Sequence, residues 1–409
     1  MSSRHKGISG VIQWLASDAC HDADDAGLAA GVAQRLRAVG IPLDLLTLHL
    51  KALHPEILGR RIAWSPHRPA QVFDREHGLD RSGAIARSPI GYVIETQEAI
   101  TLRSGDPRMA DWTQLELFRG GDLAEIRLFP LRHDEALASA AAFGTCNPGG
   151  FSDADRLALA TVIPSLRSAC ELRLRKRSEE TLLDTYLGAT TSRRILAGHV
   201  RRGDVENLEA ALFLCDLRDF TGLSDRLPEA EVLRLLNVYF DQVVPSITEA
   251  GGEILKFMGD AVFAFFHRED DAAGACADAF DAAQAGLARL EAASRANDTQ
   301  LEAGVALHYG RVSYGNIGSG HRLDFTVIGR DVNLTSRLQG VSATAGRSIV
   351  MSPTFAAHIA RPEIVSIGRY PIKGLAHPLE VFSAGSMGVE MRRKLPQTHP
   401  AGGLSEPRA

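Results

Sequence analysis

The chain has 409 residues, of which 45% are hydrophobic and 23% are charged, and its formal net charge is −5. This length predicts two or three domains, and the ordinary composition is typical of a soluble globular protein. Because there is no basic excess, nucleic acid is not an expected partner.

The cysteines and the hydropathy of the sequence indicate the cellular compartment and whether the chain spans a membrane. The five cysteines are scattered without CxxC spacing, which predicts neither a disulfide framework nor a zinc site and favours a cytoplasmic protein. No apolar run approaches the roughly 18 residues needed to span a bilayer, and the best candidate, residues 136–144, is short and rich in Ala. The basic N-terminus lacks the apolar segment of a signal peptide. We therefore expect no membrane span.

Residues 1–20 are expected to be flexible, and the first domain is expected to begin after them. Asp24 and Asp25 precede an apolar-periodic segment that stops at Gly40, which predicts an amphipathic helix. Short apolar or alternating runs separated by turn residues then predict strands. These runs cover residues 45–50, 61–64, 71–73, 99–102, 125–131 and 138–143.

A second helix begins at Phe151-Ser-Asp-Ala-Asp155, where Ser152 is the expected cap and Asp155 its partner three residues on. The resulting α+β domain, residues 21–172, resembles the GAF/PAS class of small-molecule sensor domains. That resemblance implies an effector whose identity the sequence does not give. Residues 120–122, Gly-Gly-Asp, are interpreted as a plain loop. The histidines of this domain match no metal or haem ligand spacing, so we expect them at the surface or in packing roles.

The second helix carries an apolar stripe, Leu159, Val162, Leu166 and Cys170, which predicts pairing with a second copy of the chain. Pro164 permits a kink. A basic run at residues 173–177 follows and is interpreted as a solvated helix face. Residues 173–205 are therefore expected to form a helical connector. The Pro-containing tail, residues 387–409, is expected to be disordered.

Two apolar runs, residues 254–258 and 261–266, flank Gly259-Asp260 and predict a strand-turn-strand hairpin. Both faces of the second run are apolar, so this strand should be covered on both sides. Lys256 and Asp260 stand out because a charge in an apolar setting needs a partner. For the hairpin alone, a solubilising Lys and an ordinary turn Asp remain the alternative.

An apolar strand that begins at Ala210 ends in a carboxylate, Asp216, and Phe220-Thr-Gly222 then leads into a predicted helix at residues 225–247. A strand, a loop and a helix N-terminus make an anion site because free backbone N–H groups point outwards. Asp216 and Asp260 supply two carboxylates from neighbouring strand ends. Magnesium takes one or two carboxylates and leaves its other positions to water and phosphate.

Three segments, residues 214–221, 255–260 and 324–337, resemble the sequence blocks of the class III adenylate/guanylate cyclase catalytic domain, in family order. The resemblance covers about residues 207–382. It implies a ferredoxin-like βαββαβ domain at residues 206–386, behind the GAF/PAS-like domain and the connector. It also implies a phosphorus–oxygen lyase, an adenylate cyclase that converts ATP to 3′,5′-cyclic AMP and pyrophosphate.

The resemblance implies a role for each matching position. Asp216, Leu217 and Asp260 would bind two Mg²⁺ or Mn²⁺ ions per site, and Lys256 and Thr326 would select adenine. Asn333 and Arg337 would orient the substrate for catalysis and stabilise the transition state. The other substrate contacts would come from Phe220, Thr221, Gly222, Arg311 and Lys373. A Lys can donate to adenine N1 and a Thr hydroxyl can accept from the amino group, which favours ATP over GTP. Asn333 and Arg337 are four apart, so they share one face of a helix.

In this family the metal-binding and base-selecting residues of one site come from opposite subunits, which implies a homodimer with two active sites at the interface. Asp219 departs from the family, which usually has Gly there. Its carboxylate could bind cations or repel a triphosphate. A low-turnover nucleotide-binding module and a guanylate cyclase therefore remain alternatives. In each case the N-terminal domain is expected to regulate the C-terminal one.

Overall fold

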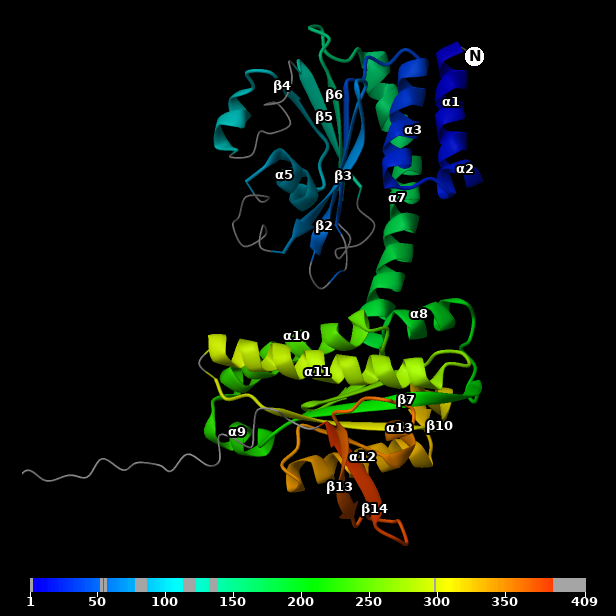
Figure 1. The fold of residues 1–409 in the computed structure, drawn as a ribbon. Helices are drawn as coiled ribbons and strands as arrows, with labels where there is room; N and C mark the ends of the chain where they lie inside the picture. The colour runs from blue at the N-terminus through cyan, green and yellow to red at the C-terminus, as the bar shows by residue number, and fades with distance from the viewer. Residues whose placement is uncertain are drawn as a thin grey trace, which may run out of the picture. The chain divides into compact units, whose positions relative to one another are not determined.

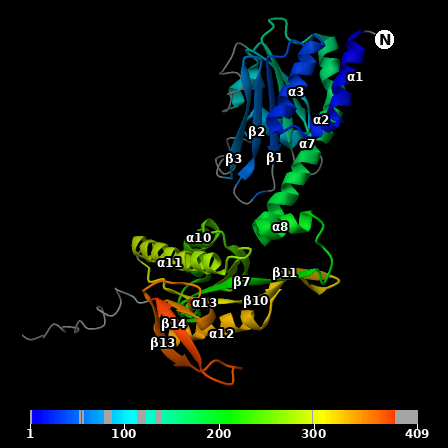
Figure 2. The same cartoon turned by 45° about the vertical axis from the view of Figure 1, so that its right-hand side comes forward.

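The computed structural model describes residues 3–51, 54, 57–77, 87–112, 123–131, 139–297 and 299–384. It divides into two compact units, Met1–Tyr186 and Leu187–Ala409, and each has one β-sheet with helices packed on it (Figures 1 and 2). The predicted mixed α+β class is confirmed. The predictions for residues 120–122 and for the tail lie outside the described residues.

The expectations about membrane-spanning helices and disulfides concern the described helices and cysteines. Across the described ranges, none of the helices combines the length and the apolar character that a bilayer crossing requires. All five cysteines fall within those ranges and all are free thiols, of which four are buried and Cys146 is exposed.

The first unit is an antiparallel sheet of six strands in the order β3-β2-β1-β6-β5-β4. The six strands predicted from alternation are all present. Two of them, Ile57–Ser65 and Arg68–Glu76, are clearly longer than predicted, and the other four match their predicted bounds to within two residues. In chain order its elements are α1 (Ser3–Leu15), α2 (Asp18–His21), α3 (Asp25–Ala38), β1 (Leu45–Lys51), β2 (Ile57–Ser65), β3 (Arg68–Glu76), α5 (Pro89–Thr96), β4 (Ile100–Arg103), the 3₁₀ helix Pro107–Asp111, β5 (Glu125–Pro130), β6 (Ala140–Thr145) and α7 (Asp153–Leu187).

Helices cover both faces of this sheet. Helices α1, α3 and α7 pack on one face in a single core cluster, and α5 packs on the other (Figure 1). Strand β1 shows the alternation, because Leu46 and Leu48 enter the first cluster while His49 points to the opposite face. His49 is a buried packing residue, as expected, with Nε2 3.1 Å from the Thr47 hydroxyl. Burial, together with nearby arginines, holds the pKa of His49 well below its ordinary value.

Two expectations for this unit differ from the structure. Residues 3–15, expected to be flexible, form helix α1, because Ile8, Val11 and Leu15 recur at helical spacing and bury against the core. The apolar stripe of α7, expected to pair with a second copy, instead fills the core of its own unit, where Leu159 and Leu166 are fully buried. Periodicity identifies a buried face without saying what buries it.

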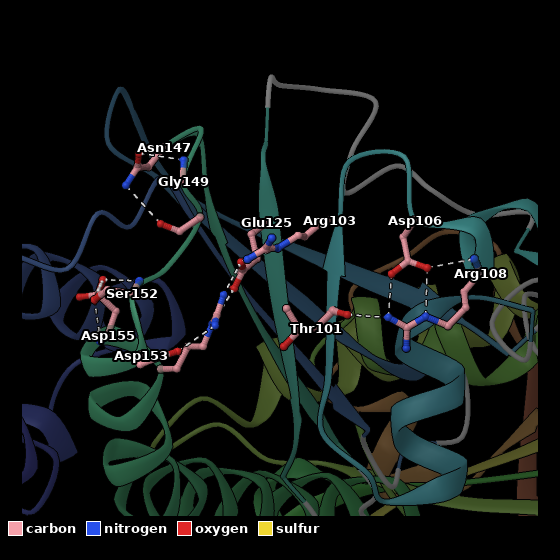
Figure 3. Close-up of polar contacts among 12 residues, drawn as sticks. Thr101, Arg103, Asp106, Arg108, Glu125, Asn147, Gly149, Ser152, Asp153 and Asp155 are labelled. Atoms are coloured by element: carbon pink, nitrogen blue, oxygen red, sulfur yellow. Dashed lines mark hydrogen bonds and ion pairs between the residues drawn. The ribbon is translucent and has the colours of Figure 1, made fainter.

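The start of α7 is fixed by polar contacts (Figure 3). The Ser152 hydroxyl accepts from the Asp155 N–H at 3.2 Å and donates to the Asp155 carboxylate at 2.6 Å, so the predicted capping pair is confirmed. Glu125 of β5, whose side chain is fully buried, accepts from Arg156 of α7 at 2.9 Å and from Arg103 of β4 at 3.3 Å. The helix is thereby tied to the sheet at its first turn.

The second unit has an eight-stranded sheet in the order β13-β14-β12-β10-β7-β9-β8, with β11 paired to β10. Its central strands, in the order β10-β7-β9-β8, form the predicted ferredoxin-like βαββαβ arrangement. In chain order the elements are α8 (Ala189–Leu196), β7 (Val205–Leu217), α9 (Phe220–Arg226), α10 (Glu229–Glu249), β8 (Glu253–Met258), β9 (Ala261–Phe266), α11 (Ala272–Ala296), β10 (Ala303–Ser319), β11 (Arg322–Ile328), α12 (Arg330–Thr344), β12 (Ile349–Met351), α13 (Pro353–Ala356), β13 (Ile364–Tyr370) and β14 (Leu379–Ala384).

Helices α10 and α11 lie side by side on one face of this sheet, and α12 packs on the other (Figures 1 and 2). The hairpin β8–β9 is confirmed, and β9 is buried on both faces as predicted. The helix predicted at residues 225–247 is observed as α10, but it begins at Glu229, later than predicted. Leu227 and Pro228 separate it from the short helix α9, because Pro228 lacks an N–H and is the N-cap of α10.

We expect replacement of Asp25 by Asn to destabilise the first unit by about 1–3 kcal/mol at neutral pH. This buried carboxylate accepts from Arg177 at 2.7 Å and from Arg60 at 3.1 Å. Burial alone would raise the pKa of Asp25, but the bonds and charges of these arginines outweigh it and lower the pKa. The stabilisation should therefore be present above pH ~4, the ordinary value, and disappear as the pH falls through the lowered one.

Urea unfolding followed by tryptophan fluorescence measures this directly, because all three tryptophans, Trp14, Trp64 and Trp112, lie in the first unit. Asp153→Asn is the matched control, since that carboxylate is 99% exposed. Equal unfolding midpoints for the two variants would contradict the assignment.

Candidate active site

Two aspartates meet at the ends of neighbouring strands in the second unit's sheet. Asp216 lies near the end of β7, and Asp260 lies in the β8–β9 turn, where Gly259 has a φ of +68°. Strand β9 pairs with β7, and Cys215 lies opposite Val262, which brings the turn next to Asp216. Burial, followed by a hydrogen bond and like-charge repulsion from Asp260, raises the pKa of Asp216 to about 7. The fold therefore forces two carboxylates together.

The donor set of this pair suits a hard divalent cation. Within the described part of the chain no group of three or more His, Cys, Asp or Glu side chains is arranged to hold a metal. Two carboxylates are nevertheless what Mg²⁺ commonly takes from a protein when substrate phosphate completes its shell. The Leu217 side chain has no donor atom and packs in the core, so the backbone oxygen is the only possible ligand from this residue.

The loop after β7 holds the residue that departs from the family pattern. Asp219 is the N-cap of α9 with a φ of +54°, in the left-handed region, and its carboxylate accepts from Arg226 at 2.9 Å. A Cβ at Gly222 would lie 2.4 Å from Asp219 Oδ1, so this carboxylate lies over the first turn of α9. Asp219 is thus paired with Arg226 beside Phe220, Thr221 and Gly222. The pKa of Asp216 is raised by burial and then by Asp260, without a contribution from Asp219.

Lys256 and Thr326 lie in a second polar group, which includes a residue that sequence reasoning missed. Lys256 Nζ lies 3.2 Å from Asp324 Oδ2, and Asp324 is two residues before Thr326 on β11, hence on the same side of that strand. Thr326 is only 6% exposed, and its hydroxyl has no hydrogen-bond partner in the structure. Such a buried group is costly unless a ligand satisfies it. Lys256 itself is half-buried, which is less enclosed than the sequence predicts.

Helix α12 presents the predicted Asn/Arg pair. Its buried face includes Thr335 and Leu338, which leaves Asn333 and Arg337 together on the exposed face, as their spacing of four predicts. Gly374 has a φ of +83°, and a Cβ there would lie 2.6 Å from Arg337 Nη1. The loop that carries Lys373 therefore packs against the Arg337 guanidinium. The structure brings these residues together from α12 and the β13–β14 connection.

A buried polar pair that the sequence did not reveal anchors the start of α12. Asp331 accepts from the Arg311 backbone N–H at 2.8 Å, and its other oxygen lies 3.5 Å from His308 Nε2. His308 is almost fully buried, and its Nδ1 lies 2.7 Å from the Ser352 hydroxyl. Burial outweighs the Asp331 charge and lowers the pKa of His308. The only sequence signal was an Asp in the first turn of a helix.

Arg311 is not brought to these groups within one chain. It lies opposite Glu209 on β7, and its guanidinium is 3.5 Å from that carboxylate, on the side of the sheet where Tyr309 packs with the α10 and α11 core. Among the described residues, no hydrogen bond or ion pair joins the aspartate pair, the Lys256–Asp324 pair and the Arg337 group to one another.

Comparisons with known proteins concern this unit. Residues 206–383 match the family described as "Adenylate and Guanylate cyclase catalytic domain". An adenylate cyclase of Anabaena cylindrica is 28% identical over 236 residues, covering 53% of this chain and 45% of that protein. Adenylate cyclase 1 of Rhizobium meliloti (strain 1021) is 29% identical over 199 residues, covering 46% and 29%. Among solved structures, the adenylyl cyclase CyaB from P. aeruginosa has 26% identity and a TM-score of 0.41, covering 44% and 95%. The chain thus spans less than half the length of both curated relatives.

We expect the aspartate pair to bind Mn²⁺, with an affinity that falls as the pH drops from 8 to 6. Protons compete with the cation once the pH reaches the pKa of Asp216, about 7, so the metal-binding form is depleted below it. Electron paramagnetic resonance of free Mn²⁺ measures the affinity. Asp216→Asn should abolish this binding, whereas Asp241→Asn, an exposed position on α10, should not. Unchanged binding in Asp216→Asn would contradict the site.

Proposed function

We propose that this chain, whose residues 206–383 are a class III nucleotide cyclase catalytic domain, converts ATP to 3′,5′-cyclic AMP and pyrophosphate. The observation that carries the proposal is the forced proximity of Asp216 and Asp260 at the ends of neighbouring strands, where burial and then Asp260 raise the pKa of Asp216 to about 7. Such a pair is costly to maintain unless a cation neutralises it. A triphosphate substrate brings divalent cations with it.

In this proposal Asp216, Asp260 and the backbone oxygen of Leu217 would hold Mg²⁺ or Mn²⁺. When bound, such ions activate the attacking 3′-hydroxyl and neutralise charge on the leaving pyrophosphate. Arg337 donates to the phosphate oxygens that gain charge as the new bond forms, and the Gly374 backbone limits where its guanidinium can lie. Asn333, on the same helix face, orients the ribose. Lys373 and Arg311 bind the remaining phosphates.

Adenine recognition would fall to Lys256 and Thr326. Lys256 donates to adenine N1, and Asp324 holds the ammonium in place through their 3.2 Å contact. The unpartnered Thr326 hydroxyl accepts from the adenine amino group, which satisfies a buried polar atom. Guanine carries a proton on N1 and would leave Lys256 facing another donor. This supports ATP rather than GTP, and product formation with the two nucleotides in competition decides between them.

We infer a homodimer from how the chain distributes its residues. The separate groups within one chain, and the exposure of Asn333 and Arg337, fit a site that a second copy completes. The end of β8 also exposes two large apolar side chains, Phe257 at 52% and Met258 at 44%, which suit an interface. The N-terminal unit would act as the sensor that regulates turnover. A change in basal rate or effector response after removal of residues 1–172 tests that role.

A second candidate is a nucleotide-binding module of the same fold with little turnover. Asp219 favours it, because this carboxylate lies over Gly222 at the loop where the triphosphate would bind. Tight ATP binding without cyclic AMP formation in either Mg²⁺ or Mn²⁺ would support the module over the enzyme.

Asp260→Asn should lower cyclic AMP formation by at least about 100-fold, because it removes one of two carboxylates that hold the cations. Chromatographic separation of cyclic AMP from ATP, with Mg²⁺ or Mn²⁺ present, measures the loss. Asp241→Asn is the matched control on the surface of α10 and should keep wild-type activity. Activity of Asp260→Asn close to that of the control would refute the mechanism.

Asp219→Gly should lower the KM for ATP by about threefold, since it removes a negative charge that Arg226 only partly offsets. It should also preserve or improve stability, because Gly adopts the +54° backbone angle of this position without strain. The effect on KM should shrink at high salt. An increase in KM would instead identify Asp219 as a contributor to cation binding.

A further inference from the structure

Helix α8, which precedes the catalytic sheet, contributes one buried hydroxyl to a polar cluster inside an apolar face. Thr191 is 2% exposed, and its hydroxyl donates to Glu253 Oε1 at 3.0 Å and lies 3.0 Å from the Tyr314 hydroxyl. Tyr314 is 1% exposed and donates to the same Glu253 oxygen. The three side chains come from α8, β8 and β10, so this Thr191 cluster joins the helix to two strands.

Both hydroxyls of the Thr191 cluster are committed to one carboxylate. A carboxylate accepts only, and each hydroxyl has one hydrogen, so two of the three contacts can be hydrogen bonds at any moment. The bonds that involve the Glu253 charge are the stronger ones. Burial, and then the bond to Glu253, raises the pKa of Tyr314, so its hydroxyl is a donor throughout the neutral range. Loss of the Thr191 hydroxyl would leave Glu253 with one donor fewer, since only the bond from Tyr314 would remain.

Strand β8 places Glu253 and Lys256 on the same face of the sheet. Residues three apart in a regular strand point to opposite faces, but the register of β8 shifts between Ile254 and Lys256. As a result, Glu253 lies opposite Phe265 and Lys256 lies opposite Phe263, two residues of one core cluster. A shift of Glu253 would therefore also displace Lys256, the residue proposed to contact the base, because both lie on the short strand β8.

Tyr314 connects the Thr191 cluster to Thr326. It lies opposite Val327 in the β10–β11 ladder, one position from Thr326. Its ring packs against Phe325 on the other side of Thr326, with centroids 4.8 Å apart. The segment after α8 is also bonded to β10, because Asn316 of that strand donates to the His199 carbonyl at 2.8 Å. Both strands that carry the base-reading residues are therefore tied to the segment that enters the domain.

We propose that Thr191 is a positioning residue for purine selection: through Glu253 and Tyr314 it fixes the spacing of Lys256 and Thr326, so that α8 sets the preference for ATP over GTP. This inference rests on the proposed function. According to this inference, α8 influences which nucleotide binds and how tightly it binds, in addition to the rate of the reaction.

The test uses the full chain and three variants. Thr191→Val removes the hydroxyl at constant shape, Thr191→Ser restores it, and Thr190→Val makes the same change at the neighbouring half-buried position, whose hydroxyl accepts only from Arg193 at 3.4 Å. We expect Thr191→Val to raise the KM for ATP about fivefold and to lower the ATP-over-GTP ratio of kcat/KM by a similar factor, with a smaller change in kcat. Thr191→Ser and Thr190→Val should stay close to wild type.

A double-mutant comparison guards against a simple packing effect. Tyr314→Phe should reproduce Thr191→Val, and the double variant should be no worse than either single one if the residues act as a unit. An ATP-over-GTP ratio of Thr191→Val that matches Thr190→Val would overturn the proposal, even if thermal stability falls. Competition of ATP and GTP against a fluorescent ATP analogue gives the same ratio from binding alone. A wild-type protein that binds but makes no cyclic nucleotide would therefore count against the proposed function, not against this inference.

Discussion

The second unit holds two carboxyl groups side by side at the ends of neighbouring strands. Asp216 and Asp260 cannot move apart, because β7 and β9 are hydrogen-bonded neighbours whose residues fill the cores on both sides of the sheet. Separating the carboxylates would mean slipping a strand register, which would turn every side chain of that strand to the wrong face. The repulsion is therefore built in, and a bound cation would relieve it. The rigidity of the sheet thus fixes the distance between the two carboxyl groups.

Much of this site is predictable from the sequence, because its signals are local. The Gly-Asp turn between two apolar runs predicts β8–β9, and the spacing of Asn333 and Arg337 predicts a shared face of α12. The positions of Asp324 and His308 were not predictable in this way. Asp324 contacts Lys256 across 68 positions of sequence, and a lone Asp in a strand carries no sign of its partner.

Other differences arise because a periodic pattern gives a buried face but not its neighbour. The stripe of α7 suits a coiled-coil partner as well as it suits α1 and α3, and the structure uses it for the latter. The side of the sheet on which Arg311 lies likewise depends on the register of β10 against β7, which no short motif encodes. The break between α9 and α10 was different, since Pro228 was a readable signal.

The register shift in β8 has a consequence for how this strand can change. The extra residue in the shift, Leu255, lets Glu253 and Lys256 share a face although they are three positions apart. Straightening the strand without shortening it would restore strict alternation and turn the ammonium towards the helices α10 and α11. Deleting Leu255 would instead leave Glu253 and Lys256 two positions apart and therefore still on one face. The direction of the Lys256 ammonium thus depends on the local backbone irregularity as well as on the residue itself.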